Sequence, residues 1–194
     1  MEFGSNLVAG ILLVAVFHSA FVLGDSGPTE LPSSLSIPPT VDAIGDGVSV
    51  PLGFIENRGQ LLNDAVRYYA NAGGVQIGLA AGVVFAAVGD AGNRGVLVSA
   101  TFEGANPTIP EGRDPLPLRT HYFRGADPAG WRADVPSFSE VEYPDLYRGI
   151  DLRYRVAPGG VKYEFRVDAG ADPDRIRIAY AGADRLTRAR FRAI

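Results

Sequence analysis

The chain has 194 residues, of which 46% are hydrophobic and 10% aromatic, values typical of one globular domain with a substantial core. The formal net charge is only −4, which argues against a surface that attracts nucleic acid or anionic lipid. Cysteine is absent, so disulfides and thiolate metal sites are excluded. The 24 glycines and 14 prolines favour short strands and many turns over long helices.

Residues 1–24 differ in character from the rest of the chain. Residues 7–24 read LVAGILLVAVFHSAFVLG, a length typical of the apolar core of a signal peptide and marginal for a membrane span. Ala20 and Gly24 offer cleavage positions, although Glu2 and the lack of a basic residue before the run are unusual for an export signal. We predict a cleaved signal peptide, with an uncleaved anchor helix or a buried helix as alternatives. Either export interpretation places the remaining chain outside the cell or on its surface, with membrane contact through this segment alone.

Residues 25–47 form a second segment with its own composition. They read DSGPTELPSSLSIPPTVDAIGDG and show no sustained hydrophobic periodicity. A stretch rich in proline, serine and glycine is typical of an extended linker. The folded domain is therefore expected to occupy residues 48–194.

Two alternating runs, 150–156 and 161–167, flank the sequence APGG and predict a β-hairpin. With Val156 opposite Val161, the charged cross-strand pairs are Asp151–Arg166, Arg153–Glu164 and Arg155–Lys162. The first two pairs join opposite charges, whereas the third joins like charges and argues mildly against this register.

Further strands are expected along most of the domain. Their predicted ranges are 48–55, 66–70, 75–79, 83–88, 96–102, 120–123, 138–143 and 175–181, with a weaker signal at 186–191. Residues 61–69 are the best candidate for a short helix. Short strands separated by turns at this density predict an all-β fold, an antiparallel β-sandwich-like domain or a barrel.

A short phrase recurs as EGANP, RGADP, AGADP and AGADR, beginning at residues 103, 124, 169 and 181. Glycine permits positive φ, the Asn or Asp side chain caps its own backbone, and proline fixes the next φ. These phrases are interpreted as turns. Asp168, Asp172, Asp174 and Asp184 also offer oxygen ligands, so a calcium site is the alternative, and calcium is the only cofactor that the sequence suggests.

Residues suited to catalysis are few. His121 is the one histidine of the expected domain, and no G-x-S-x-G elbow presents Ser99, Ser137 or Ser139 to it. We therefore interpret His121 as a strand residue with a hydrogen-bonding role. Glu140 and Glu142 share one strand face, and glycoside hydrolysis by distant carboxylates stays open.

Two further groups of residues admit a binding role beside a structural one. Aromatic residues that could stack on a sugar are Trp131, Tyr143, Tyr147 and Tyr154, although packing in the core is the commoner role of such side chains. The segment LGFIENRGQ, residues 52–60, runs from an apolar strand into polar residues. It predicts a turn held by hydrogen bonds of Glu56, Asn57 and Arg58, with the lip of a polar pocket as the alternative.

Three segments together carry a family resemblance: PLGFIENRGQ (51–60), HYFRGADPAGWRADVPSFSEVEYPDLYRGIDLRYRV (121–156) and KYEFRVDAGADPDRIRIAYAGADRL (162–186). They resemble the uncharacterised N-terminal β-domain that precedes SBBP-type β-propeller repeats in secreted bacterial and archaeal proteins. The resemblance implies a β fold, a surface location and neighbouring domains such as propeller repeats. It also implies that more strands follow, so the domain is expected to be incomplete at its C-terminus. It implies no catalytic residues.

These observations predict a non-catalytic, exported β-module of a larger cell-surface or secreted protein, with a structural, adhesion or assembly role. Its expected partners are neighbouring domains of the same polypeptide and a surface glycan or protein. A carbohydrate-binding module, and a glycoside hydrolase-like enzyme, are the alternative functions.

Overall fold

A computed structural model describes residues 53–72, 75–89, 95–157 and 160–182. The predicted signal segment 1–24, the linker 25–47, residues 48–52 of the first strand, the strand at 186–191 and Asp184 all lie outside these residues. Within the described ranges, no helix is long and apolar enough to cross a membrane.

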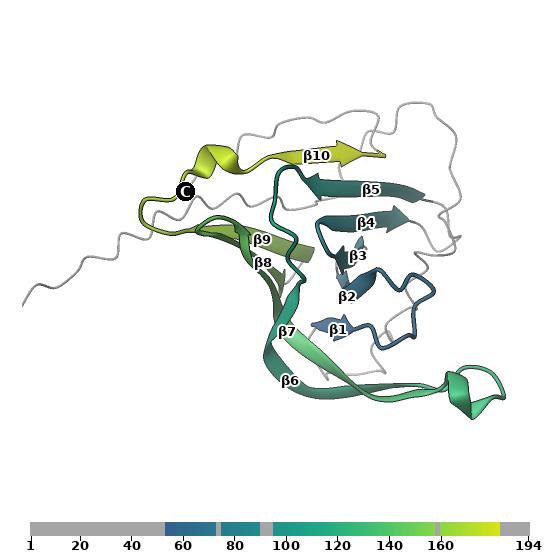
Figure 1. The fold of residues 1–194 in the computed structure, drawn as a ribbon. Helices are drawn as coiled ribbons and strands as arrows, with labels where there is room; N and C mark the ends of the chain where they lie inside the picture. Colours follow the sequence, from purple (N-terminus) through teal and green to yellow (C-terminus); the bar gives the residue numbers. More distant parts are fainter. Residues whose placement is uncertain (1–52, 73–74, 90–94, 158–159, 183–194) are drawn as a thin grey trace, which may run out of the picture.

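The described residues form one antiparallel sheet (Figure 1). Its strands are β1 (Phe54–Glu56), β2 (Val66–Ala72), β3 (Val75–Ala80), β4 (Val83–Gly89), β5 (Gly95–Phe102), β6 (Glu111–Tyr122), β7 (Arg132–Tyr147), β8 (Ile150–Ala157), β9 (Gly160–Val167) and β10 (Ile178–Ala181). The strand order is β10-β5-β4-β3-β2-β1-β7-β8-β9, and β6 pairs with β7.

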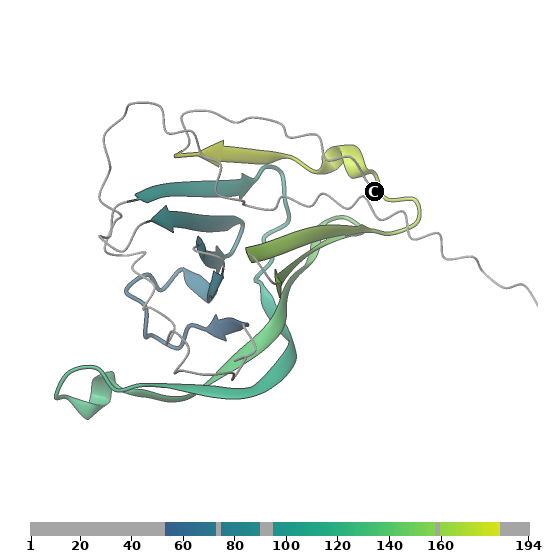
Figure 2. The same ribbon diagram turned by 180° about the vertical axis from the view of Figure 1, so that it is seen from behind.

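The prediction of an all-β, antiparallel fold is confirmed, but the two stacked sheets of a sandwich are replaced by a single sheet that curls into a half-barrel (Figures 1 and 2). The helix considered at 61–69 is wrong. Residues 61–65 form turns and bends, and β2 begins at Val66. Strand β2 pairs with β1 on one side and with β3 on the other, and this pairing overrides a weak helical signal.

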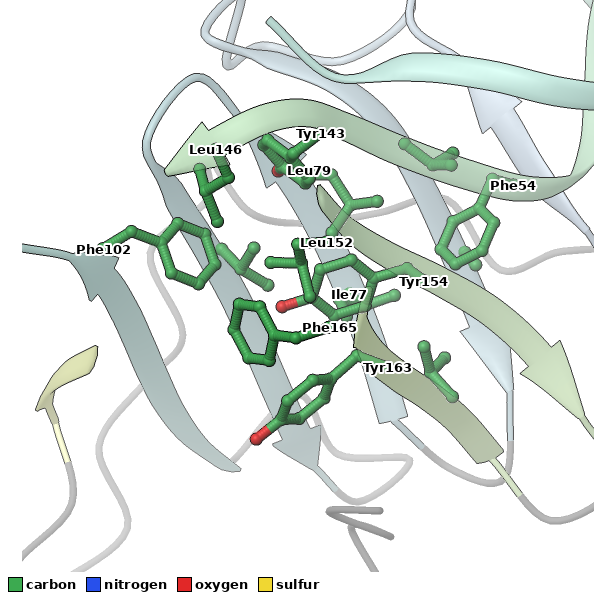
Figure 3. Packing of buried hydrophobic residues seen from close by; sticks show 14 of the residues in the cluster. Phe54, Ile77, Leu79, Phe102, Tyr143, Leu146, Leu152, Tyr154, Tyr163 and Phe165 are labelled. Carbon is green, nitrogen blue, oxygen red and sulfur yellow. The ribbon is translucent and has the colours of Figure 1, made fainter. Parts of the chain in front are cut away.

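The main core lies inside the curl, where β8 and β9 face β2 to β5 (Figure 3). Every second residue of β8 and β9 points inward, so the hairpin supplies Leu152, Tyr154, Tyr163 and Phe165 to the cluster. Ile77 and Leu79 come from the opposite arm of the sheet. Full burial of each such side chain stabilises the fold by about 1.5–3 kcal/mol.

The predicted β8–β9 register is confirmed in every pair, including the like-charge pair Arg155–Lys162. Because Val161, Tyr163 and Phe165 must all face the core, the apolar alternation fixes the register and the like-charge pair is tolerated.

Strands β6 and β7 are much longer than the predicted 120–123 and 138–143. The strand signal fails there because prolines, which cannot donate to a ladder, interrupt both segments: Pro115 and Pro117 in β6, and Pro136 and Pro144 in β7. The pairing accommodates them through register shifts, one of which lies between Pro115 and Arg119.

Candidate functional site on the β6–β7 hairpin

The β6–β7 hairpin runs along one side of the body and ends in residues 123–131, which we call the hairpin tip. In both views of the molecule this tip projects beyond the other strands (Figures 1 and 2). The last pair of the hairpin joins Tyr122 to Arg132, and the tip closes it with a 3₁₀ helix, Pro128–Gly130.

The base of the tip rests on the loop that follows β1. Asn57 organises this loop, since its side-chain oxygen accepts from the N–H groups of Gly59 (3.1 Å) and Leu61 (3.2 Å). Its amide nitrogen donates to the Val66 carbonyl at 2.8 Å. Arg58 Nε also pairs with a Glu56 carboxylate oxygen at 3.0 Å. The interpretation of ENRGQ as a hydrogen-bonded, strand-ending turn is therefore confirmed.

This loop and strand β2 each hold the hairpin in place through one direct contact. Arg132 Nε donates to the Arg58 carbonyl at 2.7 Å, and the Tyr69 hydroxyl donates to the Tyr122 hydroxyl at 2.6 Å. Gln60, which is buried, donates to the Tyr69 hydroxyl at 3.2 Å. Burial raises the pKa of both Tyr69 and Tyr122, so the two hydroxyls stay neutral at physiological pH. The tip therefore projects from a fixed base.

An aromatic cluster covers the tip and the strand residue beside it. Phe123 is 61% exposed and Trp131 is 40% exposed. Their ring centroids lie 5.3 Å apart in an edge-to-face arrangement, and His121 stacks on Phe123 at 5.9 Å. The Trp131 indole N–H donates to the Gly125 carbonyl at 3.1 Å, which fixes its ring. Large apolar side chains gathered at an exposed, projecting point are typical of a contact surface.

Of the predicted sugar-stacking residues, only Trp131 is available to a ligand. Tyr143, Tyr147 and Tyr154 are buried in the main core, which is the packing role that the sequence favoured over a sugar platform. They occupy inward positions because alternate residues of β7 and β8 face the core. Phe123, which sequence reasoning missed, takes their place beside Trp131. An aromatic residue directly before an RGADP turn, with tryptophan on the far side of the same turn, is the signal that could have located it.

The three Gly-Ala-Asx phrases that the structure describes in full, beginning at residues 103, 124 and 169, are turns, as predicted. Their glycines, Gly104, Gly125 and Gly170, have positive φ, as does Gly182 of the fourth phrase. In both GADP copies the aspartate caps a 3₁₀ helix that begins at the following proline. Asp127 accepts from the Ala129 N–H at 2.9 Å, and Asp172 accepts from the Asp174 N–H at 3.1 Å.

The calcium candidates Asp168, Asp172 and Asp174 are all exposed. In the described ranges, no three His, Cys, Asp or Glu side chains come together as a group that could hold a metal ion. Asp172 therefore has the geometry of a helix cap, which agrees with the interpretation of these phrases as turns rather than as a calcium site.

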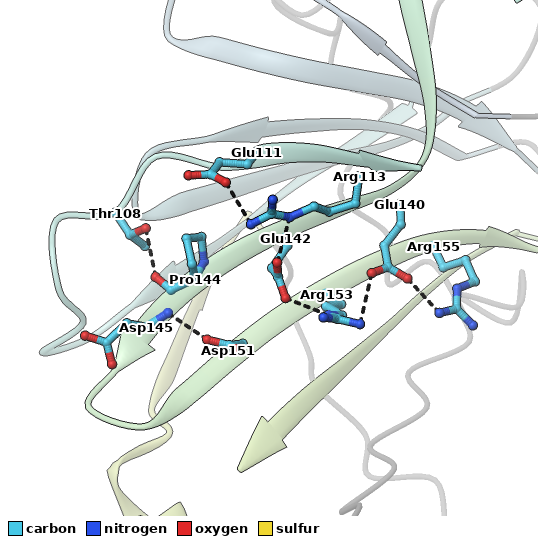
Figure 4. A network of polar contacts seen from close by, with 10 residues as sticks. All are labelled: Thr108, Glu111, Arg113, Glu140, Glu142, Pro144, Asp145, Asp151, Arg153 and Arg155. Atoms are coloured by element: carbon cyan, nitrogen blue, oxygen red, sulfur yellow. Dashed lines mark hydrogen bonds and ion pairs between the residues drawn. The ribbon is translucent and has the colours of Figure 1, made fainter. Parts of the chain in front are cut away.

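Glu140 and Glu142 lie side by side on the outer face of β7 (Figure 4). Arg153 reaches both, with Nε 2.7 Å from Glu142 Oε1 and Nη1 3.3 Å from Glu140 Oε1. Arg113 binds the other oxygen of Glu142 at 2.8 Å, and Arg155 binds the other oxygen of Glu140 at 2.6 Å. The carboxylates are only 5% and 8% exposed, so the arginines screen them from water.

These ion pairs of Glu140 and Glu142 with Arg113, Arg153 and Arg155, which we call the arginine network, have a structural role. The guanidinium groups of Arg153 and Arg113 lower the pKa of Glu142 despite the opposing effect of burial. A general acid for glycoside hydrolysis needs a raised pKa, and its partner carboxylate stands across the bond to be cleaved. Glu140 and Glu142 instead share one strand face.

His121 takes the hydrogen-bonding role that the sequence indicated. Its Nδ1 accepts from the Asp134 backbone N–H at 3.1 Å across the hairpin. Of the serines considered with it, Ser137 is buried at the β1–β7 pairing and its hydroxyl has no hydrogen-bond partner in the described structure. These two residues do not form a nucleophile–base pair.

A small apolar pocket opens between the two ends of the sheet. Its volume is about 20 Å³, and it is lined by side chains that include Tyr154, Tyr163, Ile178 and Tyr180. A space of this size holds a single water, whereas small-molecule sites are far larger. The hairpin tip is thus the stronger candidate for a functional surface.

The fold and the site together define an all-β, antiparallel half-barrel domain that presents an aromatic hairpin tip. Residues 54–190 match the model of a family described as a domain of unknown function, DUF7948, and the chain belongs to that family. The curated proteins and the solved structures contain no significant match to it.

Proposed function

We propose that this chain is a non-catalytic, exported β-module of a larger cell-surface or secreted protein, and that it acts in assembly or adhesion through its hairpin tip. The observation that carries the proposal is the exposed Phe123–Trp131 cluster on a projecting element with a fixed base. Export rests on the apolar run at residues 7–24. The association with SBBP-type propeller repeats rests on the resemblance of the sequence motifs.

The chemistry of the tip favours a protein partner, such as a neighbouring domain of the same polypeptide or another surface protein. Tryptophan and arginine dominate the energetic centres of protein interfaces, and exposed Arg119 and Arg124 flank the aromatic cluster. A sugar-binding platform presents coplanar rings, whereas Phe123 and Trp131 meet at 71°. The Trp131 N–H, a common donor to ligands, is already bonded to Gly125.

Photocrosslinking in cells that naturally produce the protein tests this proposal. A benzophenone amino acid replaces Phe123 at the tip, or Arg67, an exposed residue of β2, as the matched control. We expect a discrete crosslinked species from position 123 only, and its loss when Trp131→Ser is added. Equal crosslinking from both positions, or none from position 123, would contradict a contact role of the tip.

Carbohydrate binding is the second candidate, because Trp131 remains 40% exposed. A glycan array with the wild type and Trp131→Ala separates the two functions. The proposal predicts no glycan signal above background. Binding that disappears in a still-folded Trp131→Ala variant would replace the protein partner with a sugar.

A further inference from the structure

Three described strands, β6, β9 and β10, pair with a neighbour on one side only. Native sheets protect such edges with prolines, irregular register, short strands or charged side chains, lysine above all. Strand β6 has Pro115, Pro117 and two register shifts, and β10 has only four residues. Strand β9 has eight residues, no proline and an unbroken register with β8. Among the residues that the structure describes, no strand pairs with its outer edge, and the protection of that edge consists of charged side chains.

Lys162 of this edge strand has a residue of the same charge directly opposite it on β8. That residue is Arg155, and like charges placed directly opposite destabilise a sheet. The Arg155 guanidinium is bound to Glu140, while Lys162 is exposed and forms no ion pair within the described residues. The position is suited to a carboxylate on the unpaired side of β9.

The outward charges of β9 alternate in sign: Lys162 is positive, Glu164 negative and Arg166 positive. Such a series is complementary to itself when two copies run antiparallel. We propose that β9 is the contact edge of a homodimer, in which the β9 strands of two copies pair about a two-fold axis at Tyr163. Lys162 then faces Glu164 of the second copy, and Glu164 faces its Lys162.

The charges also select this register over its neighbours. An axis at Lys162 or at Glu164 places that residue opposite its own copy, so like charges meet. An axis at Phe165 is compatible in charge but pairs only residues 163–167 of the strand. The axis at Tyr163 pairs residues 160–166, which is nearly the whole strand, and it gives the closed, symmetric interface typical of homodimers.

Sedimentation velocity of the full chain, over a range of concentrations, tests the dimer with four proteins: the wild type, Lys162→Glu, Glu164→Lys and the double variant. The wild type is expected to dimerise. Each single change creates two like-charge pairs across the axis and should raise the dissociation constant at least about tenfold. The double variant exchanges the signs at both positions and should restore dimerisation.

Thermal unfolding of Lys162→Glu separates this role from a merely structural one. The change removes the Arg155–Lys162 repulsion within one copy, so the monomer should be as stable as the wild type or more so while the dimer weakens. A wild type that stays monomeric, or four proteins with equal dissociation constants, would overturn the proposal.

Oxidative crosslinking provides a second measurement on a chain that has no native cysteine. Lys162→Cys combined with Glu164→Cys should yield a disulfide-linked dimer, whereas the control Arg67→Cys combined with Arg119→Cys should not. Equal dimer yields from both variants would overturn the β9 interface. Phe123→Ser and Trp131→Ser at the hairpin tip should leave the dissociation constant of the dimer unchanged. The dimer proposal and the proposed contact role of the tip can therefore be tested separately, and the failure of one would not contradict the other.

Discussion

Aromatic side chains serve opposite purposes in the body of the half-barrel and at the hairpin tip. Tyr143 and Tyr147 in the body are buried, and their hydroxyls donate to the carbonyls of Ala80 and Arg177 at 2.9 Å. Phe123 and Trp131 at the tip are large and rigid too, but their rings are substantially exposed. Residue type alone therefore does not separate the residues that stabilise this fold from those that face outward.

Strand β7 connects the two regions, because it begins at Arg132, directly after the tip, and ends at Tyr147 in the body. Near Tyr143 both faces of the strand are covered. The main core covers the inner face, and the arginine network around Glu140 and Glu142 covers the outer face. At Arg132 the contacts with other described residues are the bond to the loop after β1, the pairing with Tyr122 and two bonds to carbonyls of the tip itself. Stability is thus expected to fall along one strand from body to tip.

The largest effect should come from truncating a body aromatic. Tyr143→Ala removes a fully buried ring and leaves a cavity, so the free energy of unfolding should fall by about 3–5 kcal/mol. Urea denaturation monitored by circular dichroism measures it. Tyr143→Phe is the control, because it loses only the bond to Ala80 and should cost about 1 kcal/mol. A loss below about 1 kcal/mol for Tyr143→Ala would place this ring outside the cooperative core.

An intermediate effect is expected on the outer face of β7. Glu142→Gln removes the charge that binds Arg113 and Arg153, which should cost about 1–3 kcal/mol at neutral pH. The pKa of Glu142 is lower in the folded protein than its ordinary value of 4.5. Its stabilising contribution is therefore complete above about pH 4.5 and is lost as the pH falls through the lower folded value.

The stability gap between the wild type and Glu142→Gln should accordingly narrow on acidification. Urea denaturation of both proteins at pH 7 and at pH 3 measures this gap. A gap that stays constant or widens at pH 3 would show that the carboxylate is not stabilised by the arginines.

Local patterns in the sequence predicted the hairpin and the turns, because these depend on neighbouring residues. The alternation of β8 and β9 was sufficient to set every cross-strand pair. The Gly-Ala-Asp-Pro phrase likewise encodes its own cap, as Asp127 and Asp172 show. These features need no information from distant parts of the chain.

Features that depend on distant segments were missed or misread. The predicted ion pair between Arg153 and Glu164 is a correct backbone pair, but the Arg153 side chain binds Glu142 and Glu140 on the other neighbouring strand. The alternation of residues 140–143 places Tyr143 on the face opposite Glu140 and Glu142, but it does not show which face lies in the core. The curl of the sheet decides both outcomes, and it arises from pairings between strands far apart in sequence.

The unfolding free energy of the double variant Phe123→Ser/Trp131→Ser is the most direct test of the distinction between body and tip. We predict a change of about 1 kcal/mol or less relative to the wild type, because both rings lie outside the main core. A loss as large as that of Tyr143→Ala would show that the tip aromatics hold the fold together, and it would contradict their assignment as a contact surface.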